Sequence, residues 1–203
     1  MTGPHFDFER EAMAGGRRRV AGVDEVGRGP LAGPVGVAAV ILDPDDLPEG
    51  LDDSKLLNEA KRDALREVIL AKALSVSVAF ASVEEIDLYN IRGATLRAMA
   101  RAVAALSLSP DLALIDGRDT PDGLVCSARP IIGGDGKSMS IAAASIIAKT
   151  SRDALMRNLG RDYPHYGFAD HVGYATASHR RAIALSGRCP YHRRSFCLTV
   201  ESI

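Results

Sequence analysis

The chain has 203 residues, a length that fits one domain, or one domain with a small appendage, and that buries a core without disulfide staples. Hydrophobic residues make up 46% of it and charged residues 25%, a composition that excludes a disordered chain, a collagen and a coiled coil. The net charge is only −1, no apolar run approaches the ~20 residues of a membrane span, and the N-terminus lacks a secretory signal, so we expect a cytoplasmic protein without membrane contact.

The N-terminal half predicts three strands and the first of several helices. Runs of β-branched residues and an alternating pattern indicate the strands, and a turn rich in glycine and proline joins the first two. Asn58 has the side chain of a helix N-cap. We expect a flexible extension over residues 1–18, strands over residues 17–26, 35–42 and 75–81, and a helix over residues 59–73.

The C-terminal half predicts two strands between long helices. The segment from Ser82 to Glu85 has the pattern of a capping box and opens a helix. Short apolar runs bounded by turn residues indicate buried strands. We expect a helix from residue 91 to about 107, strands over residues 112–115 and 125–128, a helix over residues 140–159 ended by Gly160, and short helices with basic loops beyond it.

This order of elements predicts an α/β fold with a mixed five-stranded sheet flanked by helices. The three early strands, joined by short links, are typical of an antiparallel meander, whereas later strands separated by helices are typical of parallel additions. We expect a catalytic domain over residues 19–160. Residues 161–203 would form a small helical, basic part packed on it.

Three segments place carboxylates where chemistry is expected. Asp24 and Glu25 end an apolar strand, where two adjacent acids are unfavourable unless they are paired or bound to metal. Because neighbouring strand residues face opposite ways, both acids can serve one site only if the strand ends or bulges there, or if Glu25 acts partly through its backbone. Asp116 ends another apolar strand, and Asp135 lies between glycines; for either residue alone, a turn is the more common explanation.

Clustered carboxylates with few histidines favour Mg²⁺ or Mn²⁺, which prefer hard oxygen ligands. Two such ions ~4 Å apart would act on a scissile phosphate. The loop of Gly27, Arg28 and Gly29 does not fit a dinucleotide-binding fingerprint, because prolines follow it and the next element is a strand. It can instead bring backbone groups close to a ligand, with Arg28 near a phosphate; a plain tight turn is the alternative.

Taken together in chain order, these motifs resemble the ribonuclease HII family. The sequence DEVGRGP at residues 24–30 with LAGP at 31–34 is similar to the signature of that family, and the resemblance extends over residues 19–197. The further matching segments are residues 51–55, 89–91, 115–117, 134–135, 140–153, 166–176 and 192–196.

The resemblance implies a ribonuclease H-like fold and an endonuclease that cuts RNA in RNA–DNA hybrids, including the 5′ side of a single ribonucleotide in duplex DNA. It also implies 3′-hydroxyl and 5′-phosphate products and a monomer that uses two metal ions. The implied metal-binding and catalytic carboxylates are Asp24, Glu25, Asp116 and Asp135. Gly27, Arg28 and Gly29 would read the 2′-hydroxyl, and Tyr174 would pack on the sugar at the junction.

One departure from the family pattern concerns the fourth carboxylate. Gly133 stands where the family often has lysine, which weakens the register at Asp135 and leaves Asp153 as the alternative. Asp153 lies four residues after Lys149, so a solvated ion pair is its competing explanation.

The basic residues are concentrated at the C-terminus. Residues 149–203 hold 9 basic and 4 acidic side chains, against 16 and 22 in residues 1–148. We expect some of these residues to contact a duplex backbone, although a solvated face is the alternative. The candidate phosphate contacts are Lys55, Lys149, Arg193 and Arg194.

The three cysteines, an odd number without a CxxC pair, indicate a reducing compartment. A zinc site at Cys189, His192 and Cys197 is a minor alternative, because it lacks a fourth ligand and the usual spacing. Three further alternatives for the function are a nuclease that acts on all-DNA substrates, a hybrid-binding module without activity and, remotely, a dinucleotide-dependent oxidoreductase.

Overall fold

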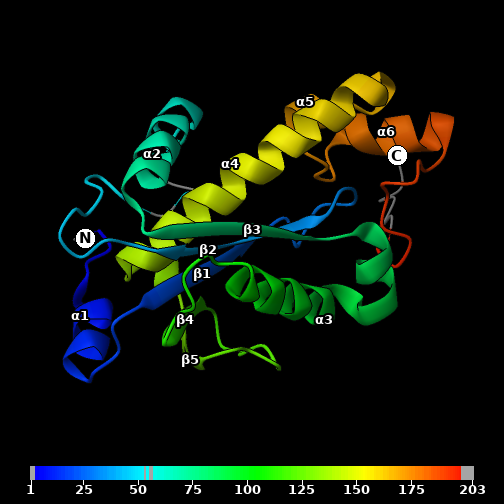
Figure 1. Ribbon diagram of the computed structural model, residues 1–203. Helices are drawn as coiled ribbons and strands as arrows, with labels where there is room; N and C mark the ends of the chain where they lie inside the picture. The colour runs from blue at the N-terminus through cyan, green and yellow to red at the C-terminus, as the bar shows by residue number, and fades with distance from the viewer. Residues whose placement is uncertain (1–2, 53, 55–56, 198–203) are drawn as a thin grey trace.

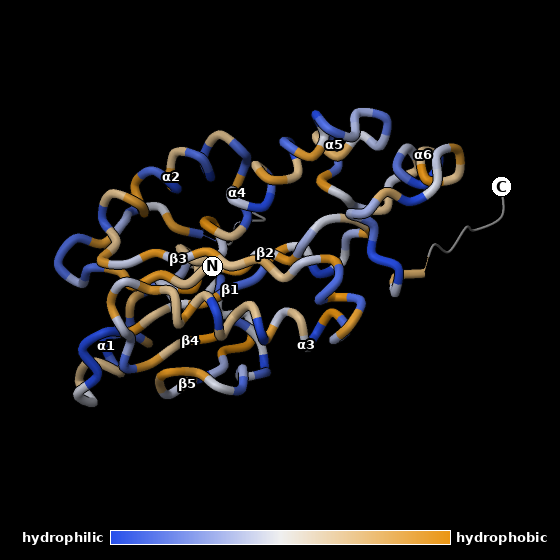
Figure 2. Tube along the Cα trace, turned by 45° about the vertical axis from the view of Figure 1, so that its right-hand side comes forward, coloured by the Kyte–Doolittle hydropathy of each residue, from blue (hydrophilic) through white to orange (hydrophobic). Residues whose placement is uncertain are grey.

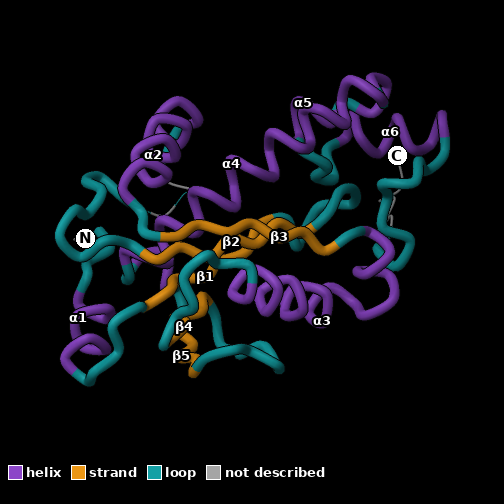
Figure 3. The backbone as a smooth tube through the Cα atoms, viewed as in Figure 1, coloured by secondary structure: helices purple, strands orange, loops and turns teal. Residues whose placement is uncertain are grey.

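The computed structural model describes residues 3–52, 54 and 57–197. It contains a five-stranded sheet in the order β3-β2-β1-β4-β5, with helices on both faces (Figures 1 and 3). The elements are α1 (Asp7–Ala14), β1 (Val20–Val26), β2 (Val35–Ile41), α2 (Glu59–Lys72), β3 (Ser75–Ala81), α3 (Val83–Ala104), β4 (Leu112–Asp116), β5 (Ser127–Ile131), the 3-10 turn η1 (Gly134–Gly136), α4 (Met139–Asp162), the 3-10 turn η2 (Pro164–Tyr166), α5 (Phe168–His171) and α6 (Ala177–Ser186).

The strand pairing confirms the predicted mixed sheet. Strand β2 pairs antiparallel with both β1 and β3, which forms the meander. Strand β4 pairs parallel with β1 and with β5. Since β1 and β4 run the same way, their carboxyl ends lie at one edge of the sheet, where functional groups of α/β proteins gather.

Alternate residues of the central strands face two separate cores. One set, including Val37 and Ala39, packs with α3, whereas Ala38 and Val40 pack with α2 and α4. All seven residues of β2 are therefore buried, which explains its unbroken apolar sequence. Figure 2 shows the apolar colours gathered on these central strands.

The helix signals in the sequence are confirmed at two starts. The Asn58 side chain accepts from the Lys61 N–H at the start of α2, and Ser82 and Glu85 form the predicted capping box. The two helices expected on either side of residue 90 form one element, α3, which is kinked at Asn90 with φ of 57°.

Gly160 does not end α4 as expected, because that helix continues to Asp162. A Cβ atom at Gly160 would lie 2.9 Å from the backbone N of Ala169, so the missing side chain lets α5 pack against α4. Strand β5 also lies later than expected and contains Pro130, which an edge strand accommodates because one of its sides forms no ladder.

The N-terminal segment differs from the flexible extension that the sequence indicates. Residues 7–14 form α1, Phe6 is 3% exposed and Glu9 is completely buried. Glu9 Oε1 accepts from the hydroxyls of Ser138 and Ser140 and from the Ser140 N–H, at 2.9 Å, at the start of α4. A buried carboxylate with donors waiting at a helix N-terminus is stabilised there, and it ties the segment to the sheet.

The segment that follows α4, residues 163–197, packs on the end of that helix (Figure 1). Its core includes Tyr166, Phe168 and Ile183, and it shares that core with Leu31 and Met156 of the main body. In the described part of the chain, no helix has the length and apolar character needed to cross a bilayer.

Candidate active site

Three carboxylates from two parallel strands converge at the sheet edge. The β1–β4 ladder ends at the pair of Val23 and Ile115, and Asp24, Glu25 and Asp116 follow directly beyond it. One ligand oxygen from each of these three acids lies within 4.8 Å of the others. We call this group the acidic cluster; within the described residues, it is the one group of acids, histidines or cysteines placed to hold a metal ion.

Of the arrangements left open for Asp24 and Glu25, the strand neither ends nor bulges at these residues. Asp24 and Glu25 stand in regular register opposite Ala38 and Val37, and β1 continues to Val26. The two acids still reach one site because no β4 residue pairs beside them. The Asp24 side chain also bonds to the backbone of the next residue, where its Oδ1 accepts from the Glu25 N–H at 2.7 Å.

The electrostatics of the acidic cluster favour a bound cation. Burial, and then the charges of Glu25 and Asp116, raise the pKa of Asp24 well above its usual value, against a hydrogen bond from Ser145. Burial also raises the pKa of Glu25, although the nearby Arg28 opposes this shift. Acids that repel one another in a buried place are stabilised by a divalent ion, and three carboxylates match the hard oxygen donors that Mg²⁺ and Mn²⁺ prefer.

Asp135 lies near the acidic cluster but is outside the group of oxygens that meet within 4.8 Å. It is 8% exposed in the turn η1, where its Oδ1 accepts from the Gly136 N–H at 3.0 Å. The preceding residue, Gly134, donates its N–H to Asp116 Oδ1 at 2.7 Å, so the turn that carries Asp135 is fixed to the acidic cluster.

Asp153, the alternative fourth carboxylate, forms an ion pair with Lys149 at 2.8 Å, as the helical spacing predicts. Both side chains are largely buried, so this pair is not a solvated one, and the Lys149 ammonium already has an anionic partner. Lys55, another candidate phosphate contact, lies outside the described residues.

The Gly-Arg-Gly loop, residues 27–34, and Tyr174 lie together beside the acidic cluster. A Cβ atom on Gly29 would lie 3.8 Å from the Tyr174 ring, and the Leu31 N–H donates to the Gly173 carbonyl at 2.9 Å. Arg28 extends to Glu25, with its Nη1 3.3 Å from Oε1. The structure therefore brings the predicted sugar-reading residues to the predicted catalytic acids.

Arg193 does not lie on the surface where a phosphate contact was expected. Its side chain is 1% exposed and donates to backbone carbonyls of the Gly-Arg-Gly loop. Arg194 remains exposed, and its backbone N–H donates to Asp87. Sequence reasoning grouped the two arginines because adjacent basic residues carry no sign of which one is buried.

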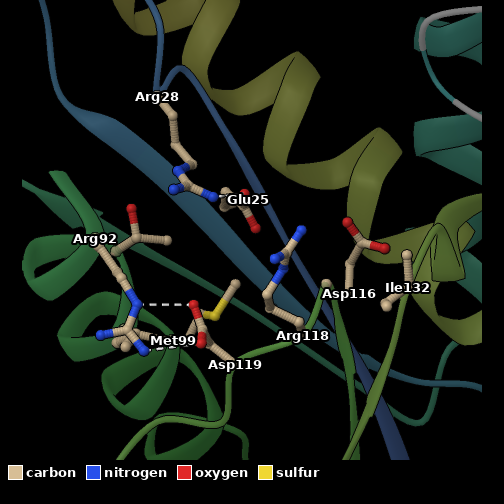
Figure 4. A pocket seen from close by; sticks show the side chains of 11 residues that line it. Glu25, Arg28, Arg92, Met99, Asp116, Arg118, Asp119 and Ile132 are labelled. Atoms are coloured by element: carbon tan, nitrogen blue, oxygen red, sulfur yellow. Dashed lines mark hydrogen bonds and ion pairs between the residues drawn. The ribbon is translucent and has the colours of Figure 1, made fainter.

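A cavity of about 380 Å³ adjoins the acidic cluster and contains residues that sequence reasoning missed. Figure 4 shows Arg28 directed toward Glu25, and Arg92 joined to Asp119. Two 2.8 Å hydrogen bonds make the Arg92–Asp119 pair bidentate. Arg118 and Asp119 lie two and three residues after the strand end at Asp116. Their place just beyond a strand end is the sequence feature that could have identified them as site residues.

The histidines of the C-terminal part form a hydrogen-bonded chain. His179 Nδ1 donates to the Tyr174 carbonyl at 2.8 Å, and the Nε2 atoms of His179 and His192 are 3.0 Å apart. His192 Nδ1 accepts from the Cys189 N–H at 2.9 Å. The Tyr174 carbonyl at one end and the Cys189 N–H at the other set the tautomers of the two neutral rings. Both nitrogens of His192 are therefore engaged in hydrogen bonds, and the minor zinc alternative finds no support.

The fold and the acidic cluster together define a metal-dependent nuclease with a ribonuclease H-like fold. The ribonuclease H2 of Pyrococcus horikoshii is a solved structure that matches this fold, with a TM-score of 0.75 and 24% identity over 88% of this chain and 93% of that one. The family model described as Ribonuclease HII matches residues 21–199.

Two curated relatives agree with the family model. The chain is 56% identical to a ribonuclease HII of Ruegeria pomeroyi over 97% of its own length and 83% of that protein. It is 54% identical to a ribonuclease HII of Brucella ovis over 95% of its own length and 88% of that protein. The chain belongs to the ribonuclease HII family, and it is a metal-dependent endonuclease that hydrolyses RNA in RNA–DNA hybrids.

Proposed function

We propose that this enzyme also cuts on the 5′ side of single ribonucleotides embedded in duplex DNA, by two-metal-ion catalysis that leaves 3′-hydroxyl and 5′-phosphate ends. The observation that carries the proposal is the position of the Tyr174 ring next to Gly29, 3.8 Å from where a Cβ atom would lie, on a loop that continues from the acidic cluster. A site that accepts one ribonucleotide must read one 2′-hydroxyl near the cutting position, because only this group separates RNA from DNA there.

The acidic cluster would hold the divalent ions, Mg²⁺ or Mn²⁺, with Asp135 as a fourth ligand from η1. When bound, such ions activate water and neutralise charge on the scissile phosphate. The chain's own groups orient the acids. The Glu25 N–H holds Asp24, Arg28 holds Glu25, and the Gly134 N–H holds Asp116.

The Gly-Arg-Gly loop would read the sugar mainly through its backbone. Arg28 and Gly29 are exposed, and Tyr174 is 44% exposed, so its ring has a free surface for the sugar at the junction. Arg194, which is exposed in the C-terminal part, would contact a phosphate farther along the duplex.

We further propose that the enzyme acts as a monomer in the cytoplasm. All the proposed catalytic and recognition groups come from one chain, so a second copy is not required to complete the site. The three cysteines are unpaired, which is consistent with a reducing compartment.

The test is to map the cut in a labelled DNA duplex that carries one ribonucleotide, with Mg²⁺ and Mn²⁺ in separate reactions. We expect one labelled product, which results from a cut on the 5′ side of the ribonucleotide and ends in a 3′-hydroxyl. An all-DNA duplex of the same sequence should stay intact, and a long hybrid should be cut at many positions. Cleavage of the hybrid without any cut at the single ribonucleotide would contradict the proposal.

A further inference from the structure

Two fully buried arginines lie behind the Gly-Arg-Gly loop. Arg193 donates from Nε to the Gly33 carbonyl at 3.0 Å, from Nη1 to the Arg28 carbonyl at 2.8 Å, and from Nη2 to the carbonyls of Gly27 and Gly33. The guanidinium thus binds both ends of the loop at once, and the planar arrangement of its donors fixes their separation.

Arg152, on α4, extends the same arrangement to the neighbouring segment. Its Nε donates to the Pro34 carbonyl at 2.9 Å and its Nη2 to the Ala32 carbonyl at 3.2 Å. Its Nη1 donates to the Val172 carbonyl at 3.0 Å, two residues before Tyr174. One side chain therefore connects the Gly-Arg-Gly loop to the segment that carries the tyrosine.

Backbone carbonyls, instead of carboxylates, accept all the hydrogen bonds that these two guanidinium groups donate within the described residues. Burial and the neighbouring charge of Arg152 lower the pKa of Arg193 to about 9, so it is still charged at neutral pH. A buried charge is unfavourable unless several hydrogen bonds satisfy it, so such a pair holds its acceptors in place.

The two arginines determine which way the carbonyl groups of the loop point. Carbonyls of five of its eight residues accept from the two arginines and so point into the protein. Arg28 and Gly29 are exposed, and their N–H groups donate to no backbone carbonyl in the described part of the chain. These N–H groups are therefore available to a ligand.

We propose that Arg152 and Arg193 are positioning residues for ribonucleotide selectivity, because they turn the loop carbonyls inward and hold the loop and Tyr174 at a fixed separation. The inference rests on the proposed reading of the 2′-hydroxyl by this loop. It assigns to Arg193 an internal role in place of the phosphate contact that the sequence indicated.

The test compares Arg193→Lys and Arg152→Lys with Ile69→Ala, all in an Asp116→Asn background that binds but does not cut. Ile69 is a buried residue of α2 and belongs to the core on the face of the sheet opposite α3. It serves as the control for lost stability. The measurement is the ratio of the dissociation constants for an all-DNA duplex and for the same duplex with one ribonucleotide.

Lysine keeps the charge but loses the fork of donors, so we expect each lysine variant to lower this ratio roughly tenfold, the effect of about one lost hydrogen bond to a charged group. Ile69→Ala should lower the melting temperature and leave the ratio unchanged. In Arg193→Ala, millimolar guanidinium should restore part of the ratio, whereas sodium at equal ionic strength should not.

Lysine variants that keep the parental ratio would overturn the inference while leaving the proposed function intact. An equal loss of the ratio in Ile69→Ala would also overturn it, since the effect would then follow stability alone. A parental protein that does not discriminate between the two duplexes would refute the proposed reading of the 2′-hydroxyl, and the inference with it, whereas the cut-mapping experiment tests the proposed function separately.

Discussion

The acidic cluster, which is buried at Asp24 and half-buried at its other two acids, and the fully buried arginine pair behind the Gly-Arg-Gly loop are two groups of like charges. The protein treats them differently. Five backbone carbonyls of the loop, with that of Val172, surround the guanidinium groups of Arg152 and Arg193. In the acidic cluster, the charges of Glu25 and Asp116 add to the effect of burial in raising the pKa of Asp24, as Arg152 adds to burial in lowering the pKa of Arg193. The shift of Asp24 is opposed by hydrogen bonds from Ser145 and the Glu25 N–H, whereas Arg193 alone donates four hydrogen bonds to carbonyls.

The difference indicates what each region is for. A buried charge that the protein itself satisfies keeps its surroundings in one conformation. Buried acids that repel one another lower stability until cations arrive, so their position reflects binding and not folding.

Replacing Asp24 by Asn should lower the rate of hybrid cleavage by about a thousandfold or more, equivalent to about 4 kcal/mol in the barrier. The same change should raise the melting temperature of the metal-free protein, because it removes a buried acid that lies beside two others of like charge. Initial rates and calorimetry in EDTA measure the two effects.

Asp170→Asn, at an exposed position of α5, is the matched control and should change neither quantity. A lowered melting temperature for Asp24→Asn would mean that the protein satisfies Asp24 internally, and the contrast between the two regions would fail.

Replacing Gly27 by Ala should lower the free energy of unfolding by about 3 kcal/mol. Gly27 has φ of +87°, and a Cβ atom there would lie 2.1 Å from Nε of Arg152, so the change disturbs both the backbone and the buried guanidinium. Urea denaturation measures the loss.

Gly123→Ala separates these two causes. Gly123 has φ of +73° and nothing within 4 Å of its Cβ position, so only backbone strain of about 1 kcal/mol is expected. Equal losses in the two variants would show that Arg152 moves aside at no energetic expense.

Replacing Glu9 by Gln should lower the free energy of unfolding by about 1.5 kcal/mol. This buried carboxylate resembles the arginine pair, because donors at the start of α4 satisfy its Oε1, although Oε2 has no hydrogen-bond partner among the described residues. Denaturant titration in EDTA, beside Asp24→Asn, should show opposite signs for the two buried acids.

Glu11→Gln is the control for Glu9. Glu11 is 66% exposed and paired with Arg129, so its loss should change the free energy of unfolding by no more than about 0.5 kcal/mol. A loss at Glu9 no larger than that at Glu11 would contradict the assignment of Glu9 as the tie between α1 and α4.

A pH-dependent effect concerns His192, whose pKa is lowered to about 4 by burial and by the neighbouring His179. A histidine whose pKa is lowered by folding stabilises the protein above its unfolded pKa, about 6.5, and this contribution is lost as the pH falls toward 4. We expect a slope of at most about 1.4 kcal/mol per pH unit in the free energy of unfolding over that interval.

Urea titrations at intervals between pH 7 and pH 4 measure this slope. The variant His5→Asn, at a half-exposed side chain, should retain it. A wild-type stability that stays flat from pH 6.5 to 4 would show that the His179–His192 pair takes up its proton without disturbing the fold.

Sequence patterns predicted the sheet and the carboxylates at the ends of two of its strands, because both features depend on local signals. The caps at Asn58 and Ser82 are contacts between neighbours in the chain, and Asp24, Glu25 and Asp116 stand directly after apolar strands. Parallel pairing then brings such strand ends together without further information.

The features that the sequence did not reveal depend on contacts across long separations. Arg193 reaches the Gly27 carbonyl over 166 residues, and Glu9 reaches Ser140 over 131. Nothing near either residue distinguishes a buried charge from an exposed one, so the N-terminal segment was expected to be an extension and Arg193 a phosphate contact. The sequence predicted a strand through residue 26 but left open how Asp24 and Glu25 reach one site, because the end of the β1–β4 ladder is set by the partner strand.

The edge strand β5 has a consequence for how molecules of this enzyme meet. Pro130 has no N–H group, and the charged Arg129 stands beside it, so the strand offers an incomplete row of donors to an approaching chain. Strand addition at this edge, the step that begins amyloid-like aggregation, is therefore hindered. The enzyme can leave the acidic cluster at the strand ends open to nucleic acid without presenting β5 as a template for another copy of itself.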